Sequence, residues 1–235
     1  MVAPLPDAAL RGLFVTGTDT GVGKTVVAAA LLAALRARGA AVRALKPLIT
    51  GLDDPHDAVW PPDHELLARA AGQTPDEVML LGYGPAVSPH LAAELCREPV
   101  RPAELERRVR AVPRDGELLV VEGVGGLLVP IAPGYDVRAL AAALEMPLVV
   151  VARPGLGTIN HTLLTLEAAR RAGLRVAGVV LNPWPRNPDA IERSNRETIE
   201  RLGGVAVSVL PALAAPDPDA LAAAGQALPL EDWLA

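Results

Sequence analysis

The stretch LFVTGTDTGVGKTVVAAALLAALRARG, residues 13–39, decides the fold. Residues 13–16 form an apolar run of strand length, and residues 25–38 have the Ala/Leu-rich composition of a helix that Gly39 ends. Between the two lies GTDTGVGKT, in which glycines let successive backbone N–H groups converge on phosphate oxygens beside a helix N-terminus. A strand, a glycine-rich loop and a helix in this order predict a phosphate-binding P-loop.

The predicted P-loop departs from the usual spacing of Gly, four residues, then Gly-Lys-Ser/Thr. Counting back from Gly23, the first glycine position holds Thr18, and Gly17 comes one residue earlier. We expect Lys24 to reach the terminal phosphates and the Thr25 hydroxyl to bind Mg²⁺. The alternative is a glycine-rich turn with a chance Lys-Thr pair, which the flanking strand and helix disfavour. The residues predicted to hold the nucleotide here are Thr18, Asp19, Thr20, Gly21, Val22, Gly23, Lys24, Thr25 and Val26.

Short apolar runs alternate with helical patterns along the rest of the chain. Further strands are expected at 42–45, 118–121, 148–151, 176–181 and 205–210, and further helices at 137–144, 160–172 and 189–202. Because these strands are continuously apolar, they indicate a parallel sheet covered on both faces. We predict one α/β domain over residues 1–235, with a P-loop NTPase fold and a mostly parallel central sheet. Loose ends are expected at 1–11 and about 212–235, and a mobile loop at 53–62.

Composition excludes several classes of protein. Half of the 235 residues are apolar, which is enough for a sizeable core, and the net charge of −5 argues against nucleic acid or an anionic membrane as partner. The sequence has no apolar run long enough to cross a membrane, and its first residues do not resemble a secretory signal. The single cysteine, Cys96, cannot form an internal disulfide, which fits a cytoplasmic protein, and we expect it to be buried.

The chain has 20 arginines but only two lysines, Lys24 and Lys46. A position that stays lysine in such a chain suggests a need for a compact ammonium group. Lys46 lies in LKPLITG, at the expected end of the second strand, on the side where the phosphates of the P-loop should lie. The alternative is an ordinary surface lysine.

Glu122 follows the apolar run 118–121 and precedes the glycines of GVGG. Ligands of open parallel sheets collect at the carboxyl ends of the strands, where a carboxylate can meet Mg²⁺ and glycines let a substrate approach the backbone. Alone, such a glutamate is more often a solvated strand end. Beside a P-loop, it predicts a metal-binding carboxylate.

Four motifs together resemble the dethiobiotin synthetase family. They are GTDTGVGKT at 17–25, KPLITG at 46–51, EGVGGLLVP at 122–130 and GLGTINHTLLT at 155–165. The resemblance implies a cytoplasmic homodimeric ligase of biotin biosynthesis. It joins CO₂ to 7,8-diaminononanoate with ATP and closes a cyclic urea through a carbamate and a carbamic–phosphoric anhydride.

The resemblance also implies roles for individual residues. Lys24, Lys46 and Thr50 would be catalytic, and Thr25, Glu122 and an aspartate would bind Mg²⁺. Asp63 is our choice for that aspartate, with Asp53, Asp54 and Asp57 as alternatives and a helix N-cap as the other role for Asp63. Asn182 would contact the adenine. The substrate would be bound by Thr18, Lys46, Thr50 and Gly125, and its carboxylate by Thr158, Ile159 and Asn160 of the partner subunit.

Two other functions remain as alternatives. A cobyrinate amidotransferase would need a glutaminase domain with a cysteine nucleophile, for which this chain has neither the length nor a suitable motif. A partitioning or septum-positioning ATPase usually has a second lysine early in the P-loop, where this chain has Thr18 or Asp19. The preference among ATP, CTP and GTP stays open.

Overall fold

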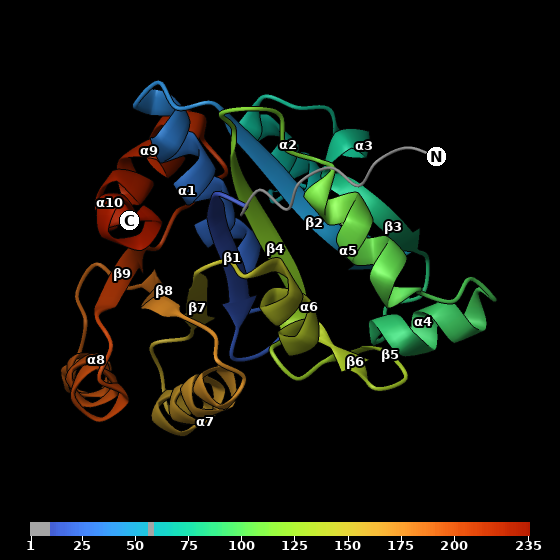
Figure 1. Cartoon of the computed structure of the whole chain (residues 1–235). Helices are drawn as coiled ribbons and strands as arrows, with labels where there is room; N and C mark the ends of the chain where they lie inside the picture. The colour runs from blue at the N-terminus through green and yellow to red at the C-terminus, as the bar shows by residue number, and fades with distance from the viewer. Residues whose placement is uncertain (1–9, 56–58) are drawn as a thin grey trace.

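Within residues 10–55 and 59–235, which this computed structural model describes, seven strands form one sheet in the order β3-β2-β4-β1-β7-β8-β9 (Figure 1). The strands are β1 (Gly12–Gly17), β2 (Val42–Thr50), β3 (Met79–Tyr83), β4 (Leu118–Gly126), β7 (Leu148–Ala152), β8 (Val176–Trp184) and β9 (Val207–Pro211). Every neighbouring pair is parallel. A small antiparallel ribbon, β5 (Pro130–Ala132) with β6 (Tyr135–Asp136), stands apart from the sheet. The predicted α/β fold with a parallel central sheet is confirmed.

Helices cover both faces of the sheet (Figure 1). One layer contains α1 (Lys24–Ala37), α2 (Asp63–Ala71), α3 (Pro75–Val78), α9 (Pro218–Gln226) and α10 (Leu230–Leu234). The other contains α4 (Pro89–Leu95), α5 (Pro102–Arg110), α6 (Val137–Leu144), α7 (Thr158–Arg171) and α8 (Ala190–Gly203). Alternate residues of β1 point to opposite faces of the sheet. Leu13 and Val15 pack against the layer of α1, and Phe14 packs against the layer of α6.

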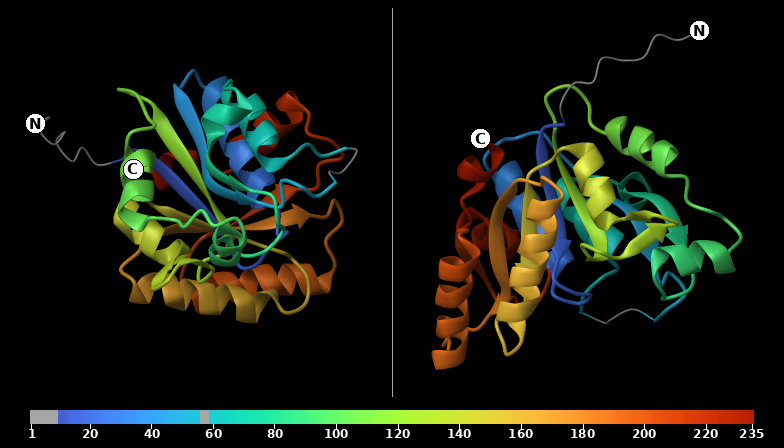
Figure 2. Two further views of the ribbon diagram at one scale, coloured as in Figure 1. Left: turned by 90° about the vertical axis from the view of Figure 1, so that its right-hand side faces the viewer. Right: turned by 60° about the horizontal axis from the view of Figure 1, so that its bottom comes forward.

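Local sequence explains the main elements. Helix α1 is rich in Ala and Leu, which have high helix propensity, and β7 (LVVVA) is a β-branched run with no solvent exposure. A capping box between Asp189 and Glu192 starts α8. Helices α7 and α8 then lie side by side on one face of the sheet (Figure 2).

Three strands extend well beyond their predicted ends. Strand β2 continues to Thr50 because β3 pairs with it from Lys46 to Thr50, so Lys46 lies within the strand and not at its end. Strand β4 likewise continues past Glu122 to Gly126, because Val15 and Gly17 of β1 pair with Glu122 and Gly126. Strand β8 continues to Trp184, which pairs with Pro211 of β9.

Two expectations about packing were wrong. The C-terminal residues are not a loose end: α9 packs against α1, and the Trp233 side chain of α10 is 1% exposed. Cys96 is exposed, because it is the C-cap of α4, outside the core face that Ala92 and Ala93 form. The predicted loop at 53–62 has no helix or strand in its described part, and residues 1–9 and 56–58 lie outside the described residues. In the described ranges, every helix is too short or too polar to span a lipid bilayer.

Candidate active site

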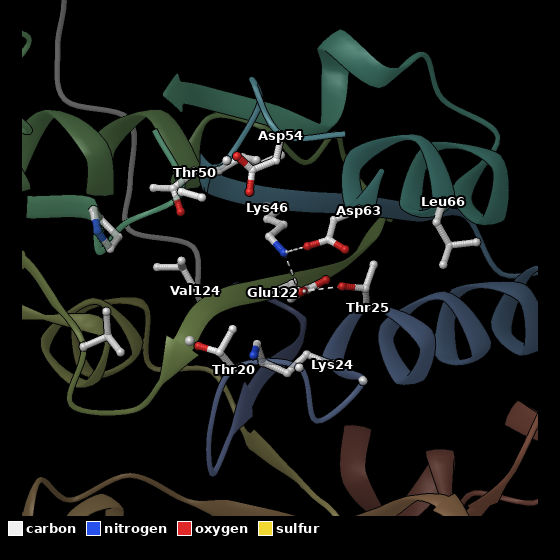
Figure 3. A pocket seen from close by; sticks show the side chains of 18 of the residues that line it. Thr20, Lys24, Thr25, Lys46, Thr50, Asp54, Asp63, Leu66, Glu122 and Val124 are labelled. Atoms are coloured by element: carbon white, nitrogen blue, oxygen red, sulfur yellow. Dashed lines mark hydrogen bonds and ion pairs between the residues drawn. The ribbon is translucent and has the colours of Figure 1, made fainter. Parts of the chain in front are cut away.

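A cavity of about 660 Å³ opens at the carboxyl ends of β2 and β4, beside the P-loop (Figure 3). Its floor is formed by P-loop residues and by Lys46 and Glu122, and its rim by the segments that follow β2 and β3. The predicted site residues that line it are Thr20, Gly21, Gly23, Lys24, Thr25, Val26, Lys46, Thr50, Asp63, Glu122 and Gly125. Residues far apart in the sequence therefore meet around one hollow.

The P-loop has a backbone conformation that requires glycine. Gly23 has φ of 85°, in the left-handed region, and a Cβ there would lie 2.0 Å from Nδ2 of Asn182. The Asn182 amide is buried and donates to the carbonyl of Val22 at 3.2 Å. Asn182 thus supports the P-loop through this hydrogen bond. The adenine contact expected for Asn182 stays a prediction.

Lys24 is a buried cation held by the P-loop itself. Its Nζ donates to the carbonyl of Asp19 at 3.1 Å, and its residue is 6% exposed. Burial lowers the pKa of Lys24 below its ordinary value, and the attraction of Glu122 offsets only part of this effect. An anionic ligand at the P-loop would favour the charged form.

Lys46 is buried between two carboxylates (Figure 3). Its Nζ donates to Oε1 of Glu122 at 2.8 Å and to Oδ2 of Asp63. Burial alone would lower the pKa of Lys46, but the charges of Glu122 and Asp63 outweigh burial and raise it above the ordinary lysine value. Lys46 is therefore charged at neutral pH and is not the surface lysine of the alternative interpretation.

Glu122 links Lys46 to the P-loop. Its Oε1 also accepts a hydrogen bond from Oγ1 of Thr25 at 2.9 Å, and the residue is 1% exposed. The second oxygen, Oε2, is buried and has no hydrogen-bond partner among the described residues. Burial raises the pKa of Glu122, because a carboxylate loses hydration there.

Asp63 is the first residue of α2, and the N-cap is Pro62, so the N-cap role considered for Asp63 is wrong. Burial acts to raise the pKa of Asp63, but Lys46, through charge and hydrogen bond, lowers it below the ordinary aspartate value. Among the alternative aspartates, Asp54 lines the cavity, and Asp53 packs beside Gly84 away from it. Asp57 lies outside the described residues.

The donor set of Thr25, Asp63 and Glu122 fits a magnesium ion. All three supply oxygen, which Mg²⁺ prefers, and all three line the cavity. The buried Oε2 of Glu122 also lacks a hydrogen-bond partner among the described residues. Within the described ranges, this cavity included, no group of three or more His, Cys, Asp or Glu side chains gathers, so the Thr25 hydroxyl is a necessary member of the donor set.

Some predicted residues lie outside this cavity. Thr18 and Asp19 line a second hollow of about 520 Å³, between the P-loop and α7, together with His161 and Leu164. Thr158, Ile159 and Asn160, expected to bind the substrate carboxylate, line neither hollow within the described part of the chain. Their role at the substrate carboxylate of another subunit stays a prediction.

Sequence reasoning missed the rim of the cavity. Trp60 and the segment 86–89 line it, and the segment follows β3, a strand that no sequence signal had indicated. It also missed Arg153, whose guanidinium donates to the carbonyl of Thr20 at 3.0 Å. Neither feature has a local motif.

Comparison with known proteins gives the family. A family model described as "AAA domain" matches residues 11–217. The chain is 45% identical to the ATP-dependent dethiobiotin synthetase BioD of Mycobacterium avium, over 90% of each chain. It is 41% identical to the protein of that name from Haloferax mediterranei, over 94% of this chain and 92% of the relative. The chain belongs to the dethiobiotin synthetase family.

As a member of that family, the chain is an ATP-dependent ligase of biotin biosynthesis that makes dethiobiotin. Solved structures show the fold alone. The cell division ATPase MinD of Pyrococcus furiosus has a TM-score of 0.52 and 21% identity, over 93% of this chain and 90% of that one. A variant of McdA from Cyanothece, solved as a complex with ATP, has a TM-score of 0.53 and 11% identity, over 97% of this chain and 93% of that one. The fold is thus shared with proteins of other functions.

Proposed function

We propose that this dethiobiotin synthetase carboxylates 7,8-diaminononanoate with CO₂ and closes the cyclic urea at the expense of ATP, giving ADP and phosphate. The observation that carries the proposal is the position of Lys46. It is a buried cation between Glu122 and Asp63, in the same cavity as Lys24 and Thr25 of the P-loop. This cavity offers two ammonium groups to a reaction in which negative charge accumulates.

The reaction proceeds in three steps. A neutral amine of the substrate attacks CO₂ and loses a proton to solvent, which leaves an anionic carbamate. A carbamate oxygen then attacks the γ-phosphorus of ATP, ADP leaves, and a carbamic–phosphoric anhydride forms. The second amine attacks the carbonyl carbon of the anhydride and loses a proton, phosphate leaves, and the ring closes.

The side chains act mainly by position and charge. Lys46 and Lys24 neutralise the charge that gathers between the carbamate and the triphosphate, and Thr50, which lines the same cavity, hydrogen-bonds the carbamate. The P-loop residues from Thr18 to Val26 hold the phosphates, and Asn182 lies near the adenine. Gly125, with φ of 61° at the cavity wall, lets the substrate approach the backbone.

Thr25, Asp63 and Glu122 would hold Mg²⁺. The ion would supply charge neutralisation at the phosphate oxygens. Binding of a cation at Oε2 of Glu122 would also give this buried oxygen the partner that the protein does not provide within its described residues.

We further propose a homodimer in which α7 of one subunit closes the site of the other. The support is a set of exposed leucines: Leu128 and Leu164, which line the second hollow, are each 57% exposed, and Leu156, in the loop before α7, is 88% exposed. A second copy of the chain would cover these side chains and bring Thr158, Ile159 and Asn160 to the substrate carboxylate. A helix N-terminus is a natural site for such an anion.

The test is direct detection of product by mass spectrometry. The protein is incubated with 7,8-diaminononanoate, bicarbonate, ATP and Mg²⁺, and each component is omitted in turn. We expect dethiobiotin only in the complete mixture, with one ADP formed for each ring closed. ATP turnover that does not need the diamine, with no dethiobiotin, would overturn the proposal and favour the partitioning ATPase alternative.

A further inference from the structure

The segment 153–157 joins β7 to α7 and is held by a side chain from a third element. Asn195 of α8 is 6% exposed, and its Nδ2 donates to the carbonyls of Pro154 at 2.8 Å and Gly155 at 3.1 Å. Both amide hydrogens of one buried side chain are therefore used on two consecutive carbonyls of this loop. Asn195 lies in none of the four family motifs and lines neither hollow.

The second of these carbonyls leads directly to the first turn of α7. The oxygen of Gly155 accepts the hydrogen bond from Asn195 and also one from the backbone N–H of Thr158 at 3.3 Å. Thr158 is the first residue of α7. The orientation of one carbonyl group thus connects the Asn195 amide to the start of the helix.

The start of α7 has backbone donors to offer. Its N-cap, Gly157, has φ of 87° and no side chain to cap the helix. In residues 10–55 and 59–235, the N–H groups of Ile159 and Asn160 have no hydrogen-bond acceptor. Unpaired N–H groups and the helix dipole make this turn suitable for an anion, provided that the turn is held in one orientation.

We propose that Asn195 is a positioning residue, which holds the N-terminus of α7 in the orientation that binds the substrate carboxylate. The inference rests on the proposed function, in which this turn receives that carboxylate. Without the amide, the half-buried carbonyls of Pro154 and Gly155 each lose one hydrogen bond, and the loop is free to turn them towards water. The first turn of α7 then moves with the loop, because its hydrogen bond to Gly155 moves too.

The same loop is also tied to the P-loop. Arg153, at its start, donates to the carbonyl of Thr20 at 3.0 Å. Arg153 therefore holds the β7 end of the segment 153–157, and Asn195 holds the part nearer to α7. Loss of the Asn195 amide should affect the part nearer to α7. The proposal consequently predicts weaker binding of the diamine acid with little change in the binding of ATP.

The experiment compares two substrates on Asn195→Ala. With 7,8-diaminononanoate, KM of the variant should rise roughly tenfold to a hundredfold, since misplacement of a binding group by a distant change has effects of this size. With the methyl ester of the substrate, which lacks the anion, KM should be nearly the same for variant and wild type. KM for ATP should stay within about twofold of the wild-type value.

Arg196→Met is the matched control. Arg196 neighbours Asn195 on α8 and also donates to a backbone carbonyl, that of Val207 at 3.2 Å, but it does not touch the loop. It should leave the ratio of the two KM values unchanged. Asn195→Gln, which keeps the amide on a longer chain, should recover part of the affinity.

Two results overturn the inference. Equal losses with the acid and its methyl ester would show that Asn195 acts only on stability, and so would an Arg196→Met variant with the same substrate-dependent loss. Failure of the proposed function has a different signature, because the wild-type protein would then form no dethiobiotin at any concentration of the diamine.

Discussion

Lys24 and Lys46 are buried cations of one cavity, but their surroundings differ. Lys24 is held by a P-loop carbonyl and its pKa is lowered by burial, whereas Lys46 lies between two carboxylates that raise its pKa. A lysine that donates to a neutral carbonyl is suited to a bound polyanion. A lysine that is paired before ligands arrive can instead be directed at a group that becomes charged during the reaction.

We expect Lys46→Arg to reduce dethiobiotin synthesis by roughly 10²–10³ while ATP affinity stays nearly unchanged. Arginine keeps the charge, but its planar fork does not fit the compact space between Glu122 and Asp63. Lys24→Arg should weaken ATP binding as well as turnover. Calorimetric ATP affinity and product yield, measured on both variants, check the difference. A Lys46→Arg variant with near-normal yield would contradict the catalytic assignment.

The Asp63–Lys46 pair should make stability depend on pH. The pKa of Asp63 is lowered in the folded state, so its contribution is complete above the unfolded pKa, about 4, and is lost as the pH falls through the folded pKa. The gap in urea midpoint between wild type and Asp63→Asn should therefore shrink from about pH 6 to about pH 3.5.

Glu65→Gln is a suitable control for this measurement, because Glu65 is on the same helix and pairs with Arg69 instead of Lys46. The difference in urea midpoint between wild type and Glu65→Gln should be small over the whole pH range, as for most exposed ion pairs. The side chain of Asp63 is 48% exposed, so solvent screening keeps the effect modest. A gap for Asp63→Asn that is constant across this pH range would show that the pair does not lower its pKa.

Single residues of the site could be predicted from the sequence where a motif or a composition marks them. The scarcity of lysine marked Lys46, and the P-loop marked Lys24 and Thr25, and all three line the cavity. Arg153 and Asn195 could not be predicted, because their partners are backbone carbonyls of distant segments. The sequence around them does not distinguish them from ordinary polar surface residues. The exposure of Cys96 was missed for a similar reason: its position beyond the buried face of α4 depends on where that helix ends.

At the scale of elements, periodicity predicted what is buried and regular. Helix α6 has the predicted bounds of 137–144, and the apolar runs of β1 and β7 were found within one residue. Strand β3 was not predicted because it is an edge strand that is mostly half-buried, so its sequence, MLLGY, has neither alternation nor a β-branched run. The three strand extensions depend on pairing with partners, which no local sequence records.

The C-terminal helix α10 is attached to the sheet by a contact that the sequence does not indicate. The indole of Trp233 lies against Gly178 of β8, where a Cβ would come within 2.8 Å of Nε1, and Arg175 donates to the Trp233 carbonyl at 2.8 Å. A small residue on the sheet and a large one on the helix thus form one contact. An Ala/Pro-rich sequence gives no sign of it, because the fit depends on both partners.

We expect Trp233→Ala to lower the free energy of unfolding by about 3–5 kcal/mol, because the side chain is fully buried and its removal leaves a cavity. Urea unfolding gives this value. Glu231→Ala, on the exposed side of the same helix, should change stability by less than about 0.5 kcal/mol. A loss below about 1 kcal/mol for Trp233→Ala would mean that α10 is only loosely attached.

At the scale of the whole molecule, exposed leucines lie near the start of α7. Leu128 and Leu164 line the hollow between the P-loop and α7, Leu156 lies in the loop before α7, and the N–H groups of Ile159 and Asn160, unpaired within the described residues, lie at the start of the same helix. An apolar surface beside an anion-binding turn is explained if a second copy of the chain docks there. Each subunit would then supply Lys46 to its own site and α7 to the site of its partner.

Complementation between two impaired variants tests this arrangement. Asn160→Asp places a carboxylate in the first turn of α7, which favours the helix but repels the substrate anion. Lys46→Arg disables the other half of the site. With each site built from two chains, a heterodimer of the variants has one site in which Lys46 and α7 are both intact. An equimolar mixture, exchanged through the monomer, should then recover about a quarter of wild-type dethiobiotin synthesis, since half of the dimers are heterodimers with one working site. With each site built from a single chain, no combination is intact, and the mixture should be no more active than the average of the two variants alone.

Light scattering on the wild type and on Leu164→Arg, with Leu202→Arg as a control at an equally exposed leucine of α8, would show that the recovery depends on this surface. A fully active monomer would exclude the shared site altogether.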